Sequence, residues 1–153
     1  MPDHISMKEQ LAMSNLIDCI IAHEGRARYA YQDSLGYWSI GIGRNIDSRC
    51  LRGLSFEEQN YLLSNDLQLC RSQLENKAYY KGQSQVRSEA LVELCFNMGI
   101  KRLETFTKML NAFVAKDYEE AAKELADSKW ARQVGSTRLN NISKRILTDA
   151  YSA

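Results

Sequence analysis

The chain has 153 residues and a hydrophobic fraction of 44%, which suit one compact domain with a substantial core. It carries 20 Lys and Arg against 19 Asp and Glu, so its formal net charge is only +1. A chain this close to neutrality lacks the broad basic field on which nucleic-acid binding depends. We therefore expect no nucleic-acid partner, and we expect a monomer.

Residues 1–10 are polar and charged, without an apolar stretch of the length that a signal peptide or membrane anchor needs. We expect a protein that is made in the cytoplasm and does not insert into a membrane. The four cysteines are far apart, with no C-x-x-C pair and only two histidines beside them, so no metal site is indicated. We expect free thiols packed mostly as small apolar groups, although a disulfide stays open. These six residues are Cys19, Cys50, Cys70, Cys95, His4 and His23.

An amphipathic helix is predicted from about residue 7 to residue 23. Ser6 and Glu9 have the spacing of a capping box, and Gly25 offers a C-terminal stop. Glu24 falls on the apolar face, where the charged form of a carboxyl group loses hydration and the protonated form is favoured. Such a group suits a general acid near neutral pH. The apolar face consists of Met13, Leu16, Ile17, Ile20 and Ile21.

A small hairpin or three-stranded sheet is predicted over about residues 28–47. Residues 37–42 alternate, carry aromatic and β-branched side chains, and have glycines beside them. Asp33 lies in the polar, turn-like stretch before them, where its carboxylate stays hydrated. Ser39 lies on the returning strand, and its hydroxyl could share a water with Asp33. Taken alone, a Glu at a helix end is usually a solvated residue, and such an Asp is usually a turn former.

The rest of the chain is predicted to be helical. Residues 45–53 form a polar connection that is too short for a further element. Ser55 and Glu58 repeat the capping-box spacing at the start of a helix that runs to about residue 74, long enough to bridge two lobes. Apolar periodicity predicts helices near residues 86–98, 106–113, 118–125 and 139–147, with a short segment from Trp130.

These elements predict a mostly helical α+β fold in one domain, residues 1–153. The order is helix, small antiparallel sheet, long helix, then a run of helices. We divide the chain into an N-terminal extension with the start of the first helix, a small lobe that carries Glu24 and Asp33, a bridging helix and a helical C-terminal lobe. Their ranges are 1–13, 14–54, 55–75 and 76–153.

The run E-G-x(7)-D-x(2)-G-x(2)-S-I-G-I-G, from Glu24 to Gly43, resembles the signature of the phage-type lysozymes of glycoside hydrolase family 24. Members of that family are bacteriophage endolysins and related muramidases. The runs L-V-E-L-C-F-N-M-G (91–99), F-T-K-M-L (106–110) and A-A-K-E-L-A-D-S-K-W (121–130) also look like segments of its C-terminal lobe. The resemblance covers about residues 14–150 and implies a two-lobe, lysozyme-like fold.

The resemblance implies a reaction and a role for each residue of the signature. The substrate is the β-1,4 bond between N-acetylmuramic acid and N-acetylglucosamine in bacterial peptidoglycan. Glu24 corresponds to the residue that protonates the leaving oxygen, and Asp33 and Ser39 to those that position the attacking water. The chemistry requires one acid that keeps its proton and one ionised partner, and it needs no metal or organic cofactor.

The chain departs from the family pattern at three places. Ser39 replaces the usual Thr, so it keeps the hydroxyl but loses the methyl group that restricts χ1. Arg44 stands where a His often follows G-I-G and pairs with an Asp of the next helix, for which Asp66 is the candidate here. The connection from Asn45 to Leu54 is shorter than in some members.

Three further residues are expected to contact the substrate. Phe96 lies on the helix that would face the cleft from the C-terminal lobe, although an aromatic residue among Leu94, Cys95 and Met98 is by default a core residue. Arg138, otherwise a plain surface residue, could meet the anionic peptide stem of the glycan. Asn45, after the signature, completes this set.

Two other functions remain open. The chain could be a glycan-binding module that does not hydrolyse, although a binder has no use for a desolvated acid such as Glu24. It could also be a lytic transglycosylase, which uses one acid/base Glu and forms a 1,6-anhydro product without water, so that Asp33 would be dispensable.

The resemblance to endolysins further implies a phage or prophage origin, lysis of the host, bacteriolytic and antimicrobial action, and access to the periplasm through a holin-made lesion. An effector or a bacterial wall-remodelling enzyme would have the same sequence features.

Overall fold

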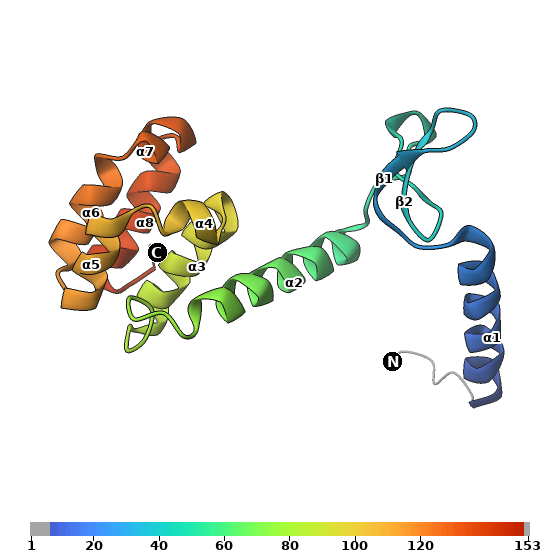
Figure 1. Cartoon of the computed structure of the whole chain (residues 1–153), viewed down its shortest axis with the longest axis horizontal. Helices are drawn as coiled ribbons and strands as arrows, with labels where there is room; N and C mark the ends of the chain where they lie inside the picture. Colours follow the sequence, from blue (N-terminus) through green and yellow to red (C-terminus); the bar gives the residue numbers. More distant parts are fainter. Residues whose placement is uncertain (1–6, 152–153) are drawn as a thin grey trace. The chain divides into compact units, whose positions relative to one another are not determined.

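The structure, a computed structural model, describes residues 7–151, and these form two compact units (Figure 1). The first unit ends at Gln59 and the second begins at Asn60. The first contains one complete α-helix, a 3-10 turn and a three-stranded antiparallel sheet, and the second is helical. The predicted α+β class, with a small sheet and a helical C-terminal lobe, is confirmed.

The first unit opens with α1, Met7–Glu24, which confirms the predicted helix to within one residue. Gly25 ends it with a left-handed backbone, φ +72°, and its N–H donates to the carbonyl of Ile21 at 2.9 Å. Glycine adopts this conformation without the strain that a Cβ causes. Ser6, the predicted partner of Glu9 in a capping box, lies outside the described residues.

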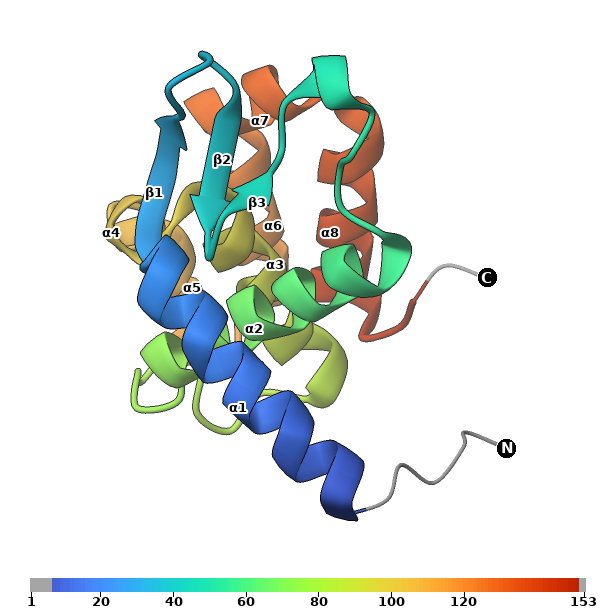
Figure 2. The ribbon, with the colours of Figure 1, turned by 90° about the vertical axis from the view of Figure 1, so that its right-hand side faces the viewer.

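The sheet consists of β1, Ala27–Gln32, β2, Trp38–Gly41, and β3, Arg44–Asn45, which pair in that order (Figure 2). The predicted range of about 28–47 is therefore close. Tyr31 pairs with Ser39 across the first ladder, and Ser39 pairs with Asn45 across the second. A register shift between Ala27 and Tyr31 interrupts the β1–β2 ladder.

The segment after β3 contains an element that we did not predict. Residues Ser48–Cys50 form a 3-10 helix, η1, whose N-cap is Asp47. A single turn of three residues is too short to show apolar periodicity in the sequence. Its one sequence signal is Asp47, because Asp is among the residues that cap helices best. The expectation that residues 45–53 were too short for a further element is therefore wrong.

Asp47 is only 5% exposed and is the centre of a hydrogen-bond network. Its carboxylate accepts from the N–H of Trp38 at 3.1 Å and from the N–H of Arg49 at 3.0 Å. The Arg49 guanidinium adds two bonds to the same carboxylate, both at 2.7 Å, and donates to the carbonyl of Gly36 at 2.6 Å. It also lies 4.4 Å from the ring centre of Tyr37. One residue pair thus ties η1 to the β1–β2 turn.

The second unit holds most of α2, Phe56–Leu74, whose first turn belongs to the first unit. The predicted capping box is confirmed: the N–H of Glu58 donates to Ser55 Oγ at 3.2 Å, and the N–H of Ser55 donates to Glu58 Oε2 at 2.8 Å. These bonds satisfy amide groups that a helix start leaves without partners.

The predicted helices of the C-terminal lobe are all present. Ser84 caps α3 through a 3.2 Å bond from the N–H of Arg87. One short helix, α4, was not predicted, because four residues after Gly99 are too few to show a helical period. The bounds are Gln85–Met98 for α3, Ile100–Leu103 for α4, Thr107–Ala115 for α5, Tyr118–Ala126 for α6, Lys129–Val134 for α7 and Ser136–Thr148 for α8.

The core of the second unit is built around α3. Five residues of that helix are buried, and they pack with apolar side chains from α2 and from α4 to α8. Trp130 is 1% exposed, and its indole N–H donates to Asn97 Oδ1 at 2.7 Å, so its polar atom is satisfied inside the core. The largest fully buried side chains are Trp130, Phe113, Leu74, Leu91, Leu94, Leu103, Met109, Leu125, Ile142, Ile146 and Cys95.

We expect Asp47→Asn to destabilise the first unit at neutral pH and to weaken its sensitivity to acid. The side-chain hydrogen bonds from Arg49 hold the pKa of Asp47 well below its ordinary range. Its contribution to stability is therefore complete above the unfolded pKa of about 3.9 and is lost as the pH falls through the lower folded value. Hydrogen exchange of the Trp38 amide, which donates to this carboxylate, measures the effect.

Asp117→Asn is the matched control, because Asp117 caps α6 through a 3.0 Å bond from the N–H of Glu120. Asn and Asp are about equally good caps, so this variant should leave the exchange of the Trp38 amide unchanged. Equal protection of that amide in wild type and Asp47→Asn at pH 7 would contradict the prediction.

Candidate active site

Glu24 is the last residue of α1, and its side chain lies against the turn between β2 and β3. A Cβ placed on Gly43 would stand 2.7 Å from Glu24 Oε2 and 3.0 Å from Cδ. The carboxyl group therefore rests on the backbone of the I-G turn in the signature. Glu24 and Gly43, which open and close the sequence motif, are therefore also in contact in the structure.

Within the first unit, the surroundings of Glu24 are exposed. Glu24 is exposed, and so are Met13, Leu16, Ile17 and Ile20 on the same helix, at 43–59%. Within the first unit, residues 13–59, no apolar side chains cover this carboxyl group, so its loss of water stays a prediction. An apolar stripe in a sequence identifies a helix face, but it does not identify what covers that face.

Asp33 follows β1 directly and is held in a tight turn, as predicted. Its Oδ1 accepts the N–H groups of Leu35 and Tyr37, both at 2.9 Å, and its own N–H donates to the carbonyl of Tyr37 at 2.9 Å. Among the side chains of residues 13–151, no donor bonds to Oδ2. The turn thus fixes the orientation of the carboxyl group and leaves one oxygen able to bind a ligand or a water.

Ser39 lies in the central strand β2 and is only 5% exposed. Tyr31 lies opposite it on β1 and Asn45 opposite it on β3. Side chains two residues apart along a strand, and those directly opposite on neighbouring strands, share a face of the sheet. The register therefore places Tyr31, Ser39 and Asn45 on the same face, and Asp33 lies in the turn that follows β1.

The amide of Asn45 is engaged in local structure. Its Oδ1 accepts the N–H of Asp47 at 2.9 Å, and its Nδ2 donates to Cys50 Sγ at 3.4 Å. These bonds hold the segment that leads into η1. The contact of Asn45 with substrate stays a prediction.

Arg44 pairs with a different acid from the one that we expected. Its Nη2 donates to Glu58 Oε2 at 2.7 Å and to the carbonyl of Gly53 at 2.9 Å. Asp66 was the predicted partner, and this prediction is wrong. The hydrogen bond from the N–H of Ser55 lowers the pKa of Glu58, and the hydrogen bond from Arg44 lowers it further by a smaller amount. The capping box thus already holds this carboxylate at the start of α2.

Phe96 and Arg138 belong to the second unit, where they line one pocket of about 390 Å³. They come from α3 and α8, which are far apart in the sequence. The fold therefore brings together two of the predicted substrate contacts. Phe96 is 45% exposed, more than a core residue would be, while its contact with substrate and that of Arg138 stay predictions.

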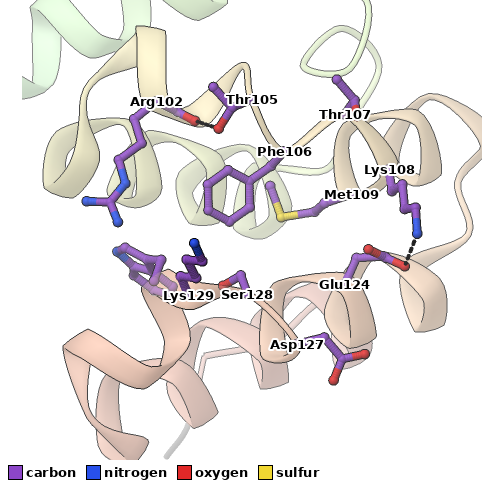
Figure 3. A pocket seen from close by; sticks show the side chains of 11 residues that line it. Arg102, Thr105, Phe106, Thr107, Lys108, Met109, Glu124, Asp127, Ser128 and Lys129 are labelled. Carbon is purple, nitrogen blue, oxygen red and sulfur yellow. Dashed lines mark hydrogen bonds and ion pairs between the residues drawn. The ribbon is translucent and has the colours of Figure 1, made fainter.

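A second pocket of about 460 Å³ in the same unit was not predicted (Figure 3). Three cationic residues, Arg102, Lys108 and Lys129, share its lining with Glu124, which lies 3.8 Å from Lys108. With Asp127, the lining carries charges of both signs. The lining residues lie on α4 to α7 and the turns between them, without a shared sequence period that could have revealed them.

Metal chemistry has no candidate centre in this part of the chain. Among the side chains that the structure describes, those of residues 13–151, no group of three or more His, Cys, Asp or Glu could hold an ion. No helix in the same range is long and apolar enough to cross a membrane. Cys70 and Cys95 are buried as expected for apolar packing, whereas Cys19 is exposed.

The comparisons with known proteins identify the family. The family described as phage lysozyme matches residues 21–146, which include both carboxyl residues, the sheet and most of the helical unit. The chain belongs to the phage lysozyme family. The resemblance that the signature indicated is thereby confirmed.

Three relatives are similar to this phage lysozyme family member at low identity. "Probable T4-type lysozyme 1" of Dictyostelium discoideum is 27% identical over 92% of this chain and 98% of its own length. "Probable T4-type lysozyme 2" of the same organism is 27% identical over 79% of this chain and 87% of its own length. "Pre-baseplate central spike protein Gp5" of Enterobacteria phage T4 is 26% identical over 82% of this chain but only 26% of its own length. The matches support lysozyme-like glycan hydrolysis.

Proposed function

We propose that this protein is a muramidase that hydrolyses the β-1,4 bond between N-acetylmuramic acid and N-acetylglucosamine in bacterial peptidoglycan. The observation that carries the proposal is the different support of two carboxyl groups in one small unit. Glu24 ends a helix and rests on the Gly43 backbone, whereas two backbone amides hold Asp33 in a turn. Acid and base roles on a glycosidic bond require such a division.

Glu24 is the proposed general acid, which gives its proton to the leaving glycosidic oxygen. The group is exposed within the first unit, and sugar rings that cover it would exclude water from it. Loss of water disfavours the charged carboxylate and keeps the proton available for transfer. The exposure of Glu24 within the first unit is therefore compatible with this role.

Asp33 and Ser39 are proposed to hold the attacking water. Oδ1 of Asp33 is occupied by two backbone donors, so Oδ2 is the oxygen that accepts from the water. The Ser39 hydroxyl, on the strand that follows the Asp33 turn, is proposed to supply a second contact. Two fixed contacts hold the water on the line of attack, which lowers the entropic cost of the reaction.

The strand β2 sets the spacing between the two carboxyl groups. Asp33 lies near its start, at the β1–β2 turn, and Glu24 lies against the turn beyond its end. Four residues of strand span about 10 Å between the first and last Cα, which is longer than the spacing of a retaining pair. We expect the carboxyl groups to lie roughly 6.5–9.5 Å apart, the spacing of an inverting enzyme, and not the roughly 5–5.5 Å of a retaining pair.

We also propose an endolysin role, with synthesis in the host cytoplasm, passage through a holin-made lesion and lysis from the periplasm. The support is membership of the phage lysozyme family. We propose that the protein acts as a monomer, without nucleic acid or a cofactor, and that it is antibacterial when added to permeabilised cells.

Glu24→Gln should fold normally and lose nearly all lytic activity, because Gln keeps the shape of the side chain but cannot donate the proton. The loss should approach the roughly 10²–10⁴-fold contribution of a general acid. Turbidity clearing of outer-membrane-permeabilised Gram-negative cells measures it, with circular dichroism to confirm folding. Glu75→Gln, the same change at an exposed position after α2, is the control. More than about a tenth of wild-type clearing would refute the role of Glu24.

Ser39→Ala should lower the rate strongly, because the water loses one of its two contacts. Ser39→Thr should be tolerated or faster, since its methyl group restricts χ1 in a strand that favours β-branched residues. Kinetics of both variants on purified peptidoglycan test this, with circular dichroism to confirm folding. If Ser39→Ala cleaves as fast as wild type, Ser39 has no part in the reaction and Asp33 positions the water alone.

The lytic transglycosylase alternative predicts a different product and a different response to Asp33→Asn. A muramidase should release muropeptides with free reducing ends and should lose activity in this variant. A transglycosylase should release 1,6-anhydro muropeptides and should retain activity, because no water attacks. Mass spectrometry of the released muropeptides distinguishes them. A glycan-binding module would produce no cleared zone in a zymogram of bacterial cell walls.

A further inference from the structure

We propose that Gly43 is a positioning residue for Glu24: it lacks a side chain so that the carboxyl group can lie against the β2–β3 turn. This inference rests on the proposed function, because it matters for catalysis only if Glu24 is the acid. Gly43 touches no substrate atom in this account. It acts by leaving open the space that the Glu24 carboxyl group occupies.

The geometry around Gly43 is unusually tight on one side. A Cβ on this residue would stand 2.7 Å from Oε2, 3.0 Å from Cδ and 3.3 Å from Cγ of Glu24. Nonbonded heavy atoms are at their optimum at about 3.5–4.0 Å, so all three distances are too short. The three nearest atoms all belong to the same side chain. Any residue other than glycine at this position therefore requires Glu24 to move.

Backbone conformation alone does not explain the site. Gly43 has φ +64°, but Gly25, Gly36 and Gly41 also have positive φ, at +72°, +77° and +69°. A Cβ at any of those three would have no neighbour within 4 Å. All four residues are glycines that relieve backbone strain. Only Gly43 combines this strain with contact to Glu24.

The predicted consequence of a side chain at position 43 is displacement of Glu24 and not collapse of the sheet. Glu24 is exposed and its carboxyl end is flexible, so the side chain can rotate away from a new methyl group. The stability cost is then the backbone strain alone, which a Cβ at Gly41 would also cause. The catalytic cost is larger, because an acid displaced by about 1 Å can lose roughly 10²-fold in rate.

The test compares Gly43→Ala with Gly41→Ala, which has the same positive φ in the same sheet without contact to Glu24. Both variants should lose a similar amount of thermal stability. Gly43→Ala should lose about tenfold to a hundredfold in kcat with little change in KM, because ground-state binding of the glycan is retained. Gly41→Ala should keep kcat within about twofold of wild type. Equal kcat values for the two variants would overturn the proposal.

A second pair of variants covers the case in which alanine at these positions prevents folding. Gly43→Asn and Gly41→Asn carry the same Cβ, and Asn tolerates a left-handed backbone better than Ala does. A nuclear Overhauser effect between Glu24 Hγ and the Hα protons of Gly43 should be present in wild type and Gly41→Asn. In Gly43→Asn the Cβ replaces the Hα that faces Glu24, so the effect to examine there is the one between Glu24 Hγ and the Hβ protons of residue 43, which should be absent. Its presence in Gly43→Asn would overturn the proposal.

The activity of Glu24→Gln and the Overhauser effect in Gly43→Asn together separate this proposal from the proposed function. If Glu24→Gln keeps its activity, the muramidase mechanism fails whatever the effect of Gly43 variants on the Glu24 side chain. If Glu24→Gln is inactive and the Overhauser effect to the Hβ protons is present in an inactive Gly43→Asn, the mechanism stands and the positioning role of Gly43 is rejected.

Discussion

The first unit depends on the buried carboxylate of Asp47. Its sheet has only three strands, the longest of six residues and the shortest of two, and so few strands bury little apolar surface. Asp47 compensates for the small apolar core, because its carboxylate accepts hydrogen bonds from the N–H of Trp38 on β2 and from the backbone N–H and the guanidinium of Arg49. Arg49 then reaches back to the carbonyl of Gly36. Hydrogen bonds thus hold the ends of the sheet in place, a role that packing in a hydrophobic core has in larger domains.

That network also sets the candidate site. Asp33 and Gly36 lie in the same turn, so the Arg49 bond to Gly36 steadies the loop from which the Asp33 carboxyl group projects. Trp38, held by Asp47, is the neighbour of Ser39 in β2. The groups proposed to hold the water are therefore supported by residues that take no part in the reaction. Such support keeps a reactive geometry within narrow limits.

Much of the fold could be predicted from the sequence, because its helices are long and periodic. Apolar spacing located α1, α2, α3, α5, α6 and α8 closely, and the Ser55–Glu58 box fixed the start of α2. The four-residue α4 and the single turn η1 were missed, since neither is long enough for a period. Asp47 was missed for a related reason: a buried Asp and a surface Asp look the same in one sequence.

Some features of the candidate site could likewise be predicted from the sequence, and others could not. The spacing from Glu24 to Gly43 identified the carboxyl groups and the sheet, because turn glycines and alternation are local signals. The exposure of Glu24 was not predictable, since it depends on what packs against the helix face. The partner of Arg44 was also misplaced, because Asp66 and Glu58 both lie on the next helix and only the path of the chain through Gly53 decides between them.

The bond between Arg44 and Glu58 couples these two positions in the stability of the first unit. Glu58 is at once a member of the capping box of α2 and the ion-pair partner of β3. If a neutral residue replaces Arg44, the carboxylate keeps its bond in the capping box and loses only its charge partner. If Glu58 is replaced, the N–H of Ser55 loses its acceptor and the guanidinium loses its acid in one step. Loss of Glu58 therefore removes more from the first unit than loss of Arg44 does.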